Sequence, residues 1–138
     1  MPPIPPVPDA AADRIRVKRI YRAARVSDGK RVLVDRLWPR GLSKDRAQLH
    51  SWCRDIAPSD ALRRWYHAHP DQWDDFAARY RDELALKGEL ARDLAGLAAE
   101  GVLTLLYAST AEERNNAIVL RDHLRHRLEE MGDADAQP

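Results

Sequence analysis

The chain has 138 residues, of which 44% are hydrophobic and 33% charged, and its net charge is +1 at pH 7. This length and composition indicate one domain with a hydrophobic core of its own. Its single cysteine excludes an internal disulfide framework. The sequence contains no run of about 18 apolar residues, which a membrane-spanning helix would need, and no recognisable export signal. We therefore expect a cytoplasmic protein with no membrane partner.

The two ends of the chain differ in composition from the middle. Residues 1–13 are rich in Pro and Ala, and residues 132–138 show no periodic pattern of apolar residues. Such segments bury too little apolar surface to offset the entropy of ordering. We therefore predict a disordered arm, a folded domain over residues 14–131, and a disordered tail.

Three strands are predicted from the apolar pattern. Apolar residues alternate or run together at 15–21, 31–35 and 102–107. The last two segments are continuous apolar runs, which indicate strands that are covered on both faces. The stretch between the first two strands contains Asp28-Gly29 and is compatible with a hairpin or with an irregular crossover.

Helical spacing of apolar residues predicts four helices after residue 58. Ser59 is placed to cap the first, the third is expected to end near Gly101, and Thr110-Ala-Glu-Glu113 is a capping-box pattern for the last. We interpret these apolar stripes as core and not as part of a cofactor site. Their members are Leu62, Trp65 and Tyr66; Trp73, Phe76, Ala77, Tyr80 and Leu84; Leu90, Leu94 and Leu97; and Ala117, Leu120, Leu124, Leu128 and Met131.

Strands and helices alternate in the second half of the chain, which predicts an α/β domain. We expect a small, mostly parallel sheet of about three or four strands flanked by helices. If the strands that end at Asp35 and Tyr107 are parallel, their carboxyl ends share one edge of the sheet. Ligands of open α/β sheets bind outside that edge.

The loop after the second strand is the most unusual part of the sequence. It reads Asp35-Arg36-Leu37-Trp38-Pro39-Arg40-Gly41 and carries two guanidinium groups, which suit phosphate or carboxylate, beside a large aromatic ring. Pro39 fixes the turn, and Gly41 allows a positive φ. In a purely structural interpretation, Asp35 pairs with Arg36 or Arg40, and Trp38 folds back over the sheet.

The segment after the third strand would face this loop. It offers polar groups at Tyr107, Ser109, Thr110 and Asn115 and the amino end of the last helix, which attracts anions. Thr110 is equally explained as a cap alone. We predict an arginine-lined pocket for a small phosphate- or carboxylate-bearing ligand, with these binding residues: Arg36, Trp38, Arg40, Tyr107, Ser109, Thr110 and Asn115.

Two carboxylates are candidates for acid or base chemistry in a hydrolase-like alternative. They are Asp35 in the arginine loop and Asp55, which lies in a tight connector where Asp commonly bonds local backbone. No metal site is predicted, because nothing completes the pair His67-x-His69. No cofactor is predicted either, since neither GxGxxG nor GxxxxGK[ST] occurs.

These motifs together resemble one protein family. The strings 32–41 (VLVDRLWPRG) and 52–59 (WCRDIAPS), with Leu62-Arg63, Leu103 to Tyr107 and Asn115, resemble the YeaO-like family of small bacterial proteins, a domain of unknown function. The resemblance covers about residues 15–128 and implies a small α/β domain without an agreed activity. It marks as family positions, without roles, Asp35, Arg36, Trp38, Pro39, Arg40, Gly41, Asp55, Pro58, Tyr107 and Asn115. More distant relatives have Cys-His-Arg where this chain has Arg114-Asn115-Asn116, so their thiol chemistry is not implied here.

The charge distribution allows a nucleic-acid-binding alternative. Residues 14–54 carry thirteen Lys/Arg and three Asp/Glu, whereas residues 55–138 carry ten and seventeen. A basic half attracts phosphate-bearing partners, but acidic helices could equally neutralise it within the fold. Binding through this half would need an exposed basic stripe and a steep dependence on salt, the stripe consisting of Arg14, Arg16, Lys18, Arg19, Arg22 and Arg25. A winged-helix regulator is disfavoured, because no helix-turn-helix pair with a basic second helix is recognisable. We favour the small-ligand pocket.

Overall fold

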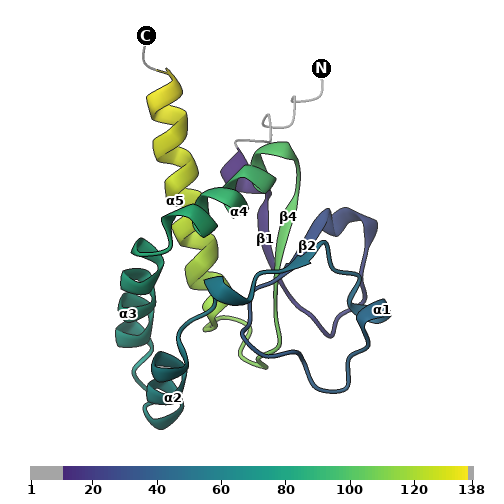
Figure 1. The fold of residues 1–138 in the computed structure, drawn as a ribbon, viewed down its shortest axis with the longest axis vertical. Helices are drawn as coiled ribbons and strands as arrows, with labels where there is room; N and C mark the ends of the chain where they lie inside the picture. Colours follow the sequence, from purple (N-terminus) through teal and green to yellow (C-terminus); the bar gives the residue numbers. More distant parts are fainter. Residues whose placement is uncertain (1–10, 137–138) are drawn as a thin grey trace, which may run out of the picture.

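Four parallel strands form one sheet in the order β1-β4-β2-β3. Figure 1 labels the first three of these strands. The computed structural model describes residues 11–136, with side chains for residues 11–130. The strands are β1 (Ile15–Arg19), β2 (Lys30–Leu33), β3 (Ser51–Trp52) and β4 (Leu103–Tyr107). This confirms the predicted α/β class and the parallel sheet.

β4 lies between β1 and β2 and determines how the first part of the chain runs. Ile15 pairs with Leu103 on one side of β4, and Lys30 pairs with the same residue on the other side. Because β1 and β2 are parallel and not adjacent, residues 20–29 form a crossover, and the hairpin alternative is wrong. The short strand β3, which pairs with β2 through Val32 and Leu33, was not predicted.

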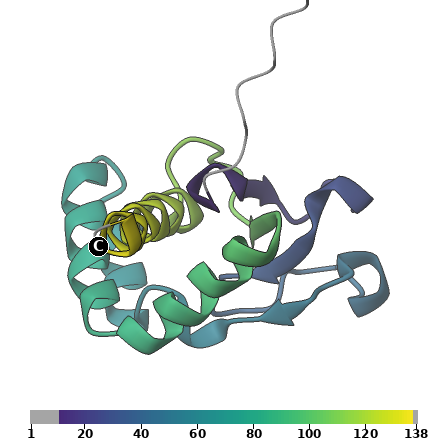
Figure 2. The same cartoon turned by 90° about the horizontal axis from the view of Figure 1, so that it is seen from above.

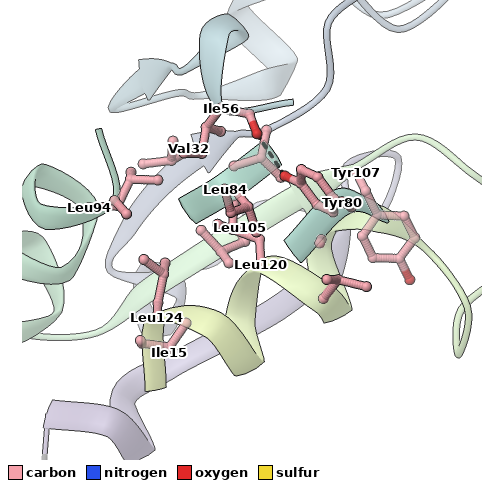
Figure 3. Close-up of a cluster of buried hydrophobic side chains, with 14 of the residues drawn as sticks. Ile15, Val32, Ile56, Tyr80, Leu84, Leu94, Leu105, Tyr107, Leu120 and Leu124 are labelled. Carbon is pink, nitrogen blue, oxygen red and sulfur yellow. Dashed lines mark hydrogen bonds between the residues drawn. The ribbon is translucent and has the colours of Figure 1, made fainter. Parts of the chain in front are cut away.

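Three helices cover one face of the sheet. They are α3 (Trp73–Ala85), α4 (Gly88–Glu100) and α5 (Asn116–Ala136), and Figure 2 shows α5 nearly end-on with α3 and α4 beside it. Their apolar stripes, including Tyr80, Leu94 and Leu120, bury the strand residues Ile15 and Leu105 (Figure 3). The residues of the predicted stripes lie in this core or pack against it, and the partly buried ones are Trp65, Tyr66, Trp73, Leu90, Leu97 and Leu128. The side chain of Met131 lies outside the described side chains.

Loops, not a helix layer, cover the second face. Ile20, Leu33 and Leu106 are buried there. Above them Trp38 packs edge-on against Trp52, with ring centroids 5.5 Å apart. Trp38 therefore does fold back over the sheet, as the structural interpretation of the loop predicted. The short helix α1 (Lys44–Ala47) belongs to the same cover.

A buried carboxylate fixes the crossover between β1 and β2. Asp28 ends the short 3₁₀-helix η2 (Val26–Asp28), and its carboxylate lies 2.6 Å from Arg31 Nη1 and 2.9 Å from Lys18 Nζ. It also accepts a hydrogen bond from the backbone N–H of Arg25 at 3.0 Å. Burial by itself would raise the pKa of Asp28, but these three donors outweigh it and hold the pKa below its ordinary value. Asp28 is therefore an ionised anchor beneath the crossover.

The last helix begins later than predicted. α5 starts at Asn116, with Asn115 as its cap: Asn115 Oδ1 accepts a hydrogen bond from Ile118 N at 3.1 Å. The Asn115 amide also donates to the carbonyls of Ala111 (2.8 Å) and Glu112 (3.2 Å), which holds the preceding residues in a non-helical turn. The capping-box prediction at Thr110 is wrong because Asn is a better N-cap than Thr and Asn115 also makes these extra bonds.

Regular structure extends beyond the predicted limits of the folded domain at both ends of the described residues. Residues 11–13 belong to the 3₁₀-helix η1 (Ala11–Arg14), in which Ala12 is buried, and residues 132–136 belong to α5. The remainder of the predicted arm and tail lies outside the described residues. Within residues 11–136, none of the helices combines the length and apolar character that crossing a membrane requires.

Candidate functional site

A pocket of about 470 Å³ opens at the carboxyl edge of the sheet. Its walls come from residues 35–40 after β2, from parts of residues 108–116 after β4, and from the helix α2 (Asp60–Ala68). The two loops meet because β2 and β4 are neighbouring parallel strands. The predicted juxtaposition of these two segments at one edge is confirmed.

Four arginines line this pocket: Arg36, Arg40, Arg63 and Arg114. Arg36 Nε and Arg63 Nη2 share Asp60 Oδ1, at 3.3 and 3.5 Å. Neither Arg40 nor Arg114 forms an ion pair with any carboxylate in the described part of the chain. Two of the four arginines therefore have no carboxylate partner among the described residues.

Asp35 supplies the only carboxylate among the described residues that line the pocket. Its Oδ2 accepts a hydrogen bond from Ala108 N (2.9 Å), and its Oδ1 accepts one from Asn116 Nδ2 (3.1 Å), which also donates to Val34 O (3.0 Å). Asp35 thus joins the ends of β2 and β4 to the start of α5. The predicted ion pair with Arg36 or Arg40 is wrong.

The pKa of Asp35 is raised because burial disfavours its charged form more than the two hydrogen bonds favour it. Because the pKa is higher in the folded state, Asp35 adds stability at acid pH, below its ordinary pKa of 3.8. This stability is lost as the pH rises from 3.8 through the folded pKa. We expect the free energy of unfolding of wild type relative to Asp35→Asn to fall across this window. Urea denaturation of both proteins at several pH values measures it, and parallel pH profiles would contradict it.

Part of the pocket lining is apolar and aromatic. Tyr66 of α2 stacks on Phe76 of α3, with ring centroids 4.5 Å apart and planes 24° from parallel. Buried Tyr80 donates to Ile56 O at 2.7 Å and so fixes the chain just before Ala57 and Pro58, which complete this wall. The pocket lining therefore combines arginines with a rigid cluster of aromatic and apolar side chains.

The structure brings together most of the predicted binding residues. Arg36, Trp38, Arg40, Ser109 and Asn115 line the pocket, although the amide of Asn115 is fully engaged as the α5 cap. The two exceptions are Tyr107, which is buried at the end of β4 and borders a separate hollow beside β1, and Thr110, which is exposed.

Asp55 lies away from the pocket. It is exposed in the 3₁₀-helix η3 (Arg54–Ile56), and the described residues that line the pocket do not include it. Of the two candidate acids, only Asp35 therefore lines the pocket.

Sequence reasoning missed one wall of the pocket. Arg63, Tyr66 and His67 lie on one face of α2, at the i, i+3, i+4 spacing that places side chains together. That spacing was available from the sequence, but nothing in it indicated which face of α2 meets the pocket. The other lining residues not predicted as binding residues include Tyr21, Arg114 and Asn116.

The pair His67-x-His69 does not form a metal site. His67 lines the pocket, whereas the His69 ring stacks on Trp65 at 4.8 Å and its Nδ1 lies 2.8 Å from Trp65 O. Among the side chains that the structure describes, no group of three or more His, Cys, Asp or Glu is arranged to hold a metal ion.

Comparison with known proteins gives one family and several relatives. The family profile described as "Inactive DUF488-N3 subclade" matches residues 14–138. The uncharacterized protein Rv3073c of Mycobacterium tuberculosis is 44% identical over 114 residues, which cover 83% of this chain and 96% of that protein. The uncharacterized protein YeaO of Escherichia coli is 42% identical over 111 residues, covering 80% and 96%. No solved structure matches this chain.

Proposed function

This chain belongs to the YeaO-like DUF488 family, and we propose that it binds a small phosphate- or carboxylate-bearing ligand in the arginine-lined pocket at the carboxyl edge of its sheet. The observation that carries this proposal is the charge of the pocket: four arginines from three segments meet, against one carboxylate whose two oxygens already accept hydrogen bonds. We place this binding in the cytoplasm, where the single thiol would stay reduced.

The arrangement favours binding without thiol chemistry. The matching family is described as inactive, and the segment where distant relatives carry Cys-His-Arg is here Arg114-Asn115-Asn116. Asn115 caps α5 and Asn116 bonds Asp35, so both amides support the wall of the pocket. Cys53, with its pKa raised by burial, is not among the described lining residues. Since a raised pKa lowers the thiolate fraction, this thiol is a poor nucleophile.

Arg40 and Arg114 are the groups best placed to hold the anion. No described carboxylate competes for them, so a ligand need not displace an internal partner. A charge-assisted hydrogen bond contributes about 1.5–3 kcal/mol, or about 10- to 100-fold in affinity. Arg36 and Arg63, which share Asp60, would contribute less.

The ion pairs of the basic half favour this pocket over nucleic-acid binding. Lys30 pairs with Glu100 at 2.5 Å, and Arg22 pairs with Glu112. Lys18 is held by Asp28. Glu100 and Glu112 thus offset part of the basic half, which supports the interpretation of internal neutralisation, whereas Asp28 belongs to the basic half itself.

We expect calorimetric titration with inorganic phosphate, phosphate monoesters and carboxylates to give at least one ligand that binds wild type. Arg40→Ala and Arg114→Ala should each weaken its binding by about tenfold or more, because each removes a charged donor. Arg64→Ala is the matched control, since Arg64 is an exposed arginine of α2 outside the pocket lining. A loss in Arg64→Ala as large as that in Arg40→Ala would mean that only general charge attracts the ligand. If the panel gave no binding at all, the proposal would be wrong.

A further inference from the structure

We propose that the anionic ligand of this pocket carries a planar aromatic or heteroaromatic ring, attached directly or by a short linker to its phosphate or carboxylate group. This inference rests on the proposed function and narrows it from any small anion to an aromatic phosphate or carboxylate.

The size of the pocket argues against a bare inorganic anion. Its volume of about 470 Å³ lies within the range of about 300–1,000 Å³ that is typical of sites for organic ligands. A water molecule takes about 30 Å³ of liquid, so a lone phosphate ion would leave most of this space to solvent. The ligand that fills the pocket therefore has a substantial non-ionic part.

The lining indicates what that part is. Tyr66 contacts the pocket and is only partly buried, and its ring stacks on buried Phe76. Phe76 in turn packs against Trp73 (5.6 Å) and Tyr80 (6.1 Å), so the outermost ring is supported by a rigid aromatic cluster. A fixed ring that still borders open space is a stacking platform for another planar ring.

An exposed apolar residue beside the pocket supports the same conclusion. Leu37 is 59% exposed, in contrast to most large hydrophobic side chains of the described chain, and it lines the pocket between Arg36 and Trp38. An apolar ligand group would cover part of this side chain and gain hydrophobic stabilisation, which a bare anion would not.

The spacing of Arg63 and Tyr66 limits the distance between the anionic group and the ring of the ligand. Arg63 and Tyr66 are three residues apart on α2 and both line the pocket. Such positions have Cβ atoms about 5–6 Å apart on one helix face. A ligand that stacks on Tyr66 and whose anionic group also reaches Arg63 therefore has that group close to its ring.

The test compares three phosphate probes on wild type by calorimetric titration: phenyl phosphate, cyclohexyl phosphate and inorganic phosphate. The first two have the same charge and similar size and differ in the planarity of the ring. We expect phenyl phosphate to bind several-fold to about tenfold more tightly than cyclohexyl phosphate, and inorganic phosphate to bind most weakly. Because this comparison uses wild type alone, it does not depend on any variant folding.

Two substitutions then locate the ring. Tyr66→Leu should abolish the preference for phenyl phosphate over cyclohexyl phosphate, whereas Tyr66→Phe should keep it. Thermal unfolding checks that both variants are folded. Equal binding of phenyl, cyclohexyl and inorganic phosphate, with dependence on Arg40 retained, would overturn this inference and leave the proposed function intact. Binding of none of these probes, nor of aromatic carboxylates such as benzoate, would overturn both.

Discussion

Asp28→Ala is expected to lower the free energy of unfolding by about 3–5 kcal/mol, because it removes one partner from a buried ion cluster. Arg31 is 4% exposed, and its Nη1 lies 2.6 Å from the Asp28 carboxylate. Its Nε donates to Ala47 O, so the guanidinium cannot turn towards solvent without breaking a second bond. Urea denaturation at neutral pH measures the loss.

Asp71→Ala is the matched control for this prediction. Asp71 is an exposed loop carboxylate, so its removal should change stability by no more than about 0.5 kcal/mol. The pKa of Asp28 is lowered in the fold, so its contribution is present above 3.8, the ordinary value, and is lost as pH falls through the folded pKa. The difference between wild type and Asp28→Ala should therefore shrink in acid. Equal losses in Asp28→Ala and Asp71→Ala at neutral pH would refute the anchoring role.

The sequence predicts correctly those parts of the fold in which the local pattern of residues favours the same structure as the tertiary contacts. Val32, Leu33 and Val34 are all buried, as a continuous apolar run predicts for a strand covered on both sides. Ser59 caps α2 by accepting a hydrogen bond from Leu62 N at 3.1 Å. The edge at which the arginine loop meets the segment after β4 followed from parallel pairing alone.

The parts that did not follow depend on contacts between distant residues. β3 has two residues, too few for a pattern, and exists because Ser51 and Trp52 pair with β2. Two caps compete for the start of α5, and the sequence does not decide between them. The helix starts at Asn116 because the side chain of this residue donates hydrogen bonds to Val34 and Asp35, about eighty residues earlier in the chain.

The same reason explains the errors at the candidate site. A carboxylate next to two arginines in sequence predicts an ion pair, yet Asp35 bonds the backbone of Ala108, which only the sheet brings near. Asp60 does pair with Arg36, but Asp60 belongs to α2, and β3 lies between these two residues in the chain. Residue type identified the loop, but the partners of its side chains were determined by topology.

Gly29→Ala is expected to destabilise the protein by about 3–5 kcal/mol, because strain and overlap act together. Gly29 has φ +62° and ψ −130°, a combination that is essentially limited to glycine. A Cβ at this position would overlap Val102 O and lie 2.9 Å from Val102 Cβ. The same carbonyl accepts the Lys30 N–H at 3.0 Å, where β2 first meets β4, so relief of the overlap would separate these strands.

Gly41→Ala separates the two contributions. Gly41 also has a positive φ, +72°, but a Cβ there would meet no heavy atom of the described chain within 4 Å. Backbone strain alone should therefore lower stability by about 1–2 kcal/mol. Urea denaturation of both variants gives the comparison. If the two losses of stability were equal, backbone strain alone would account for the effect of Gly29→Ala. The close approach of the crossover to Val102 would then contribute nothing to the position of β2 and of the arginine loop that follows it.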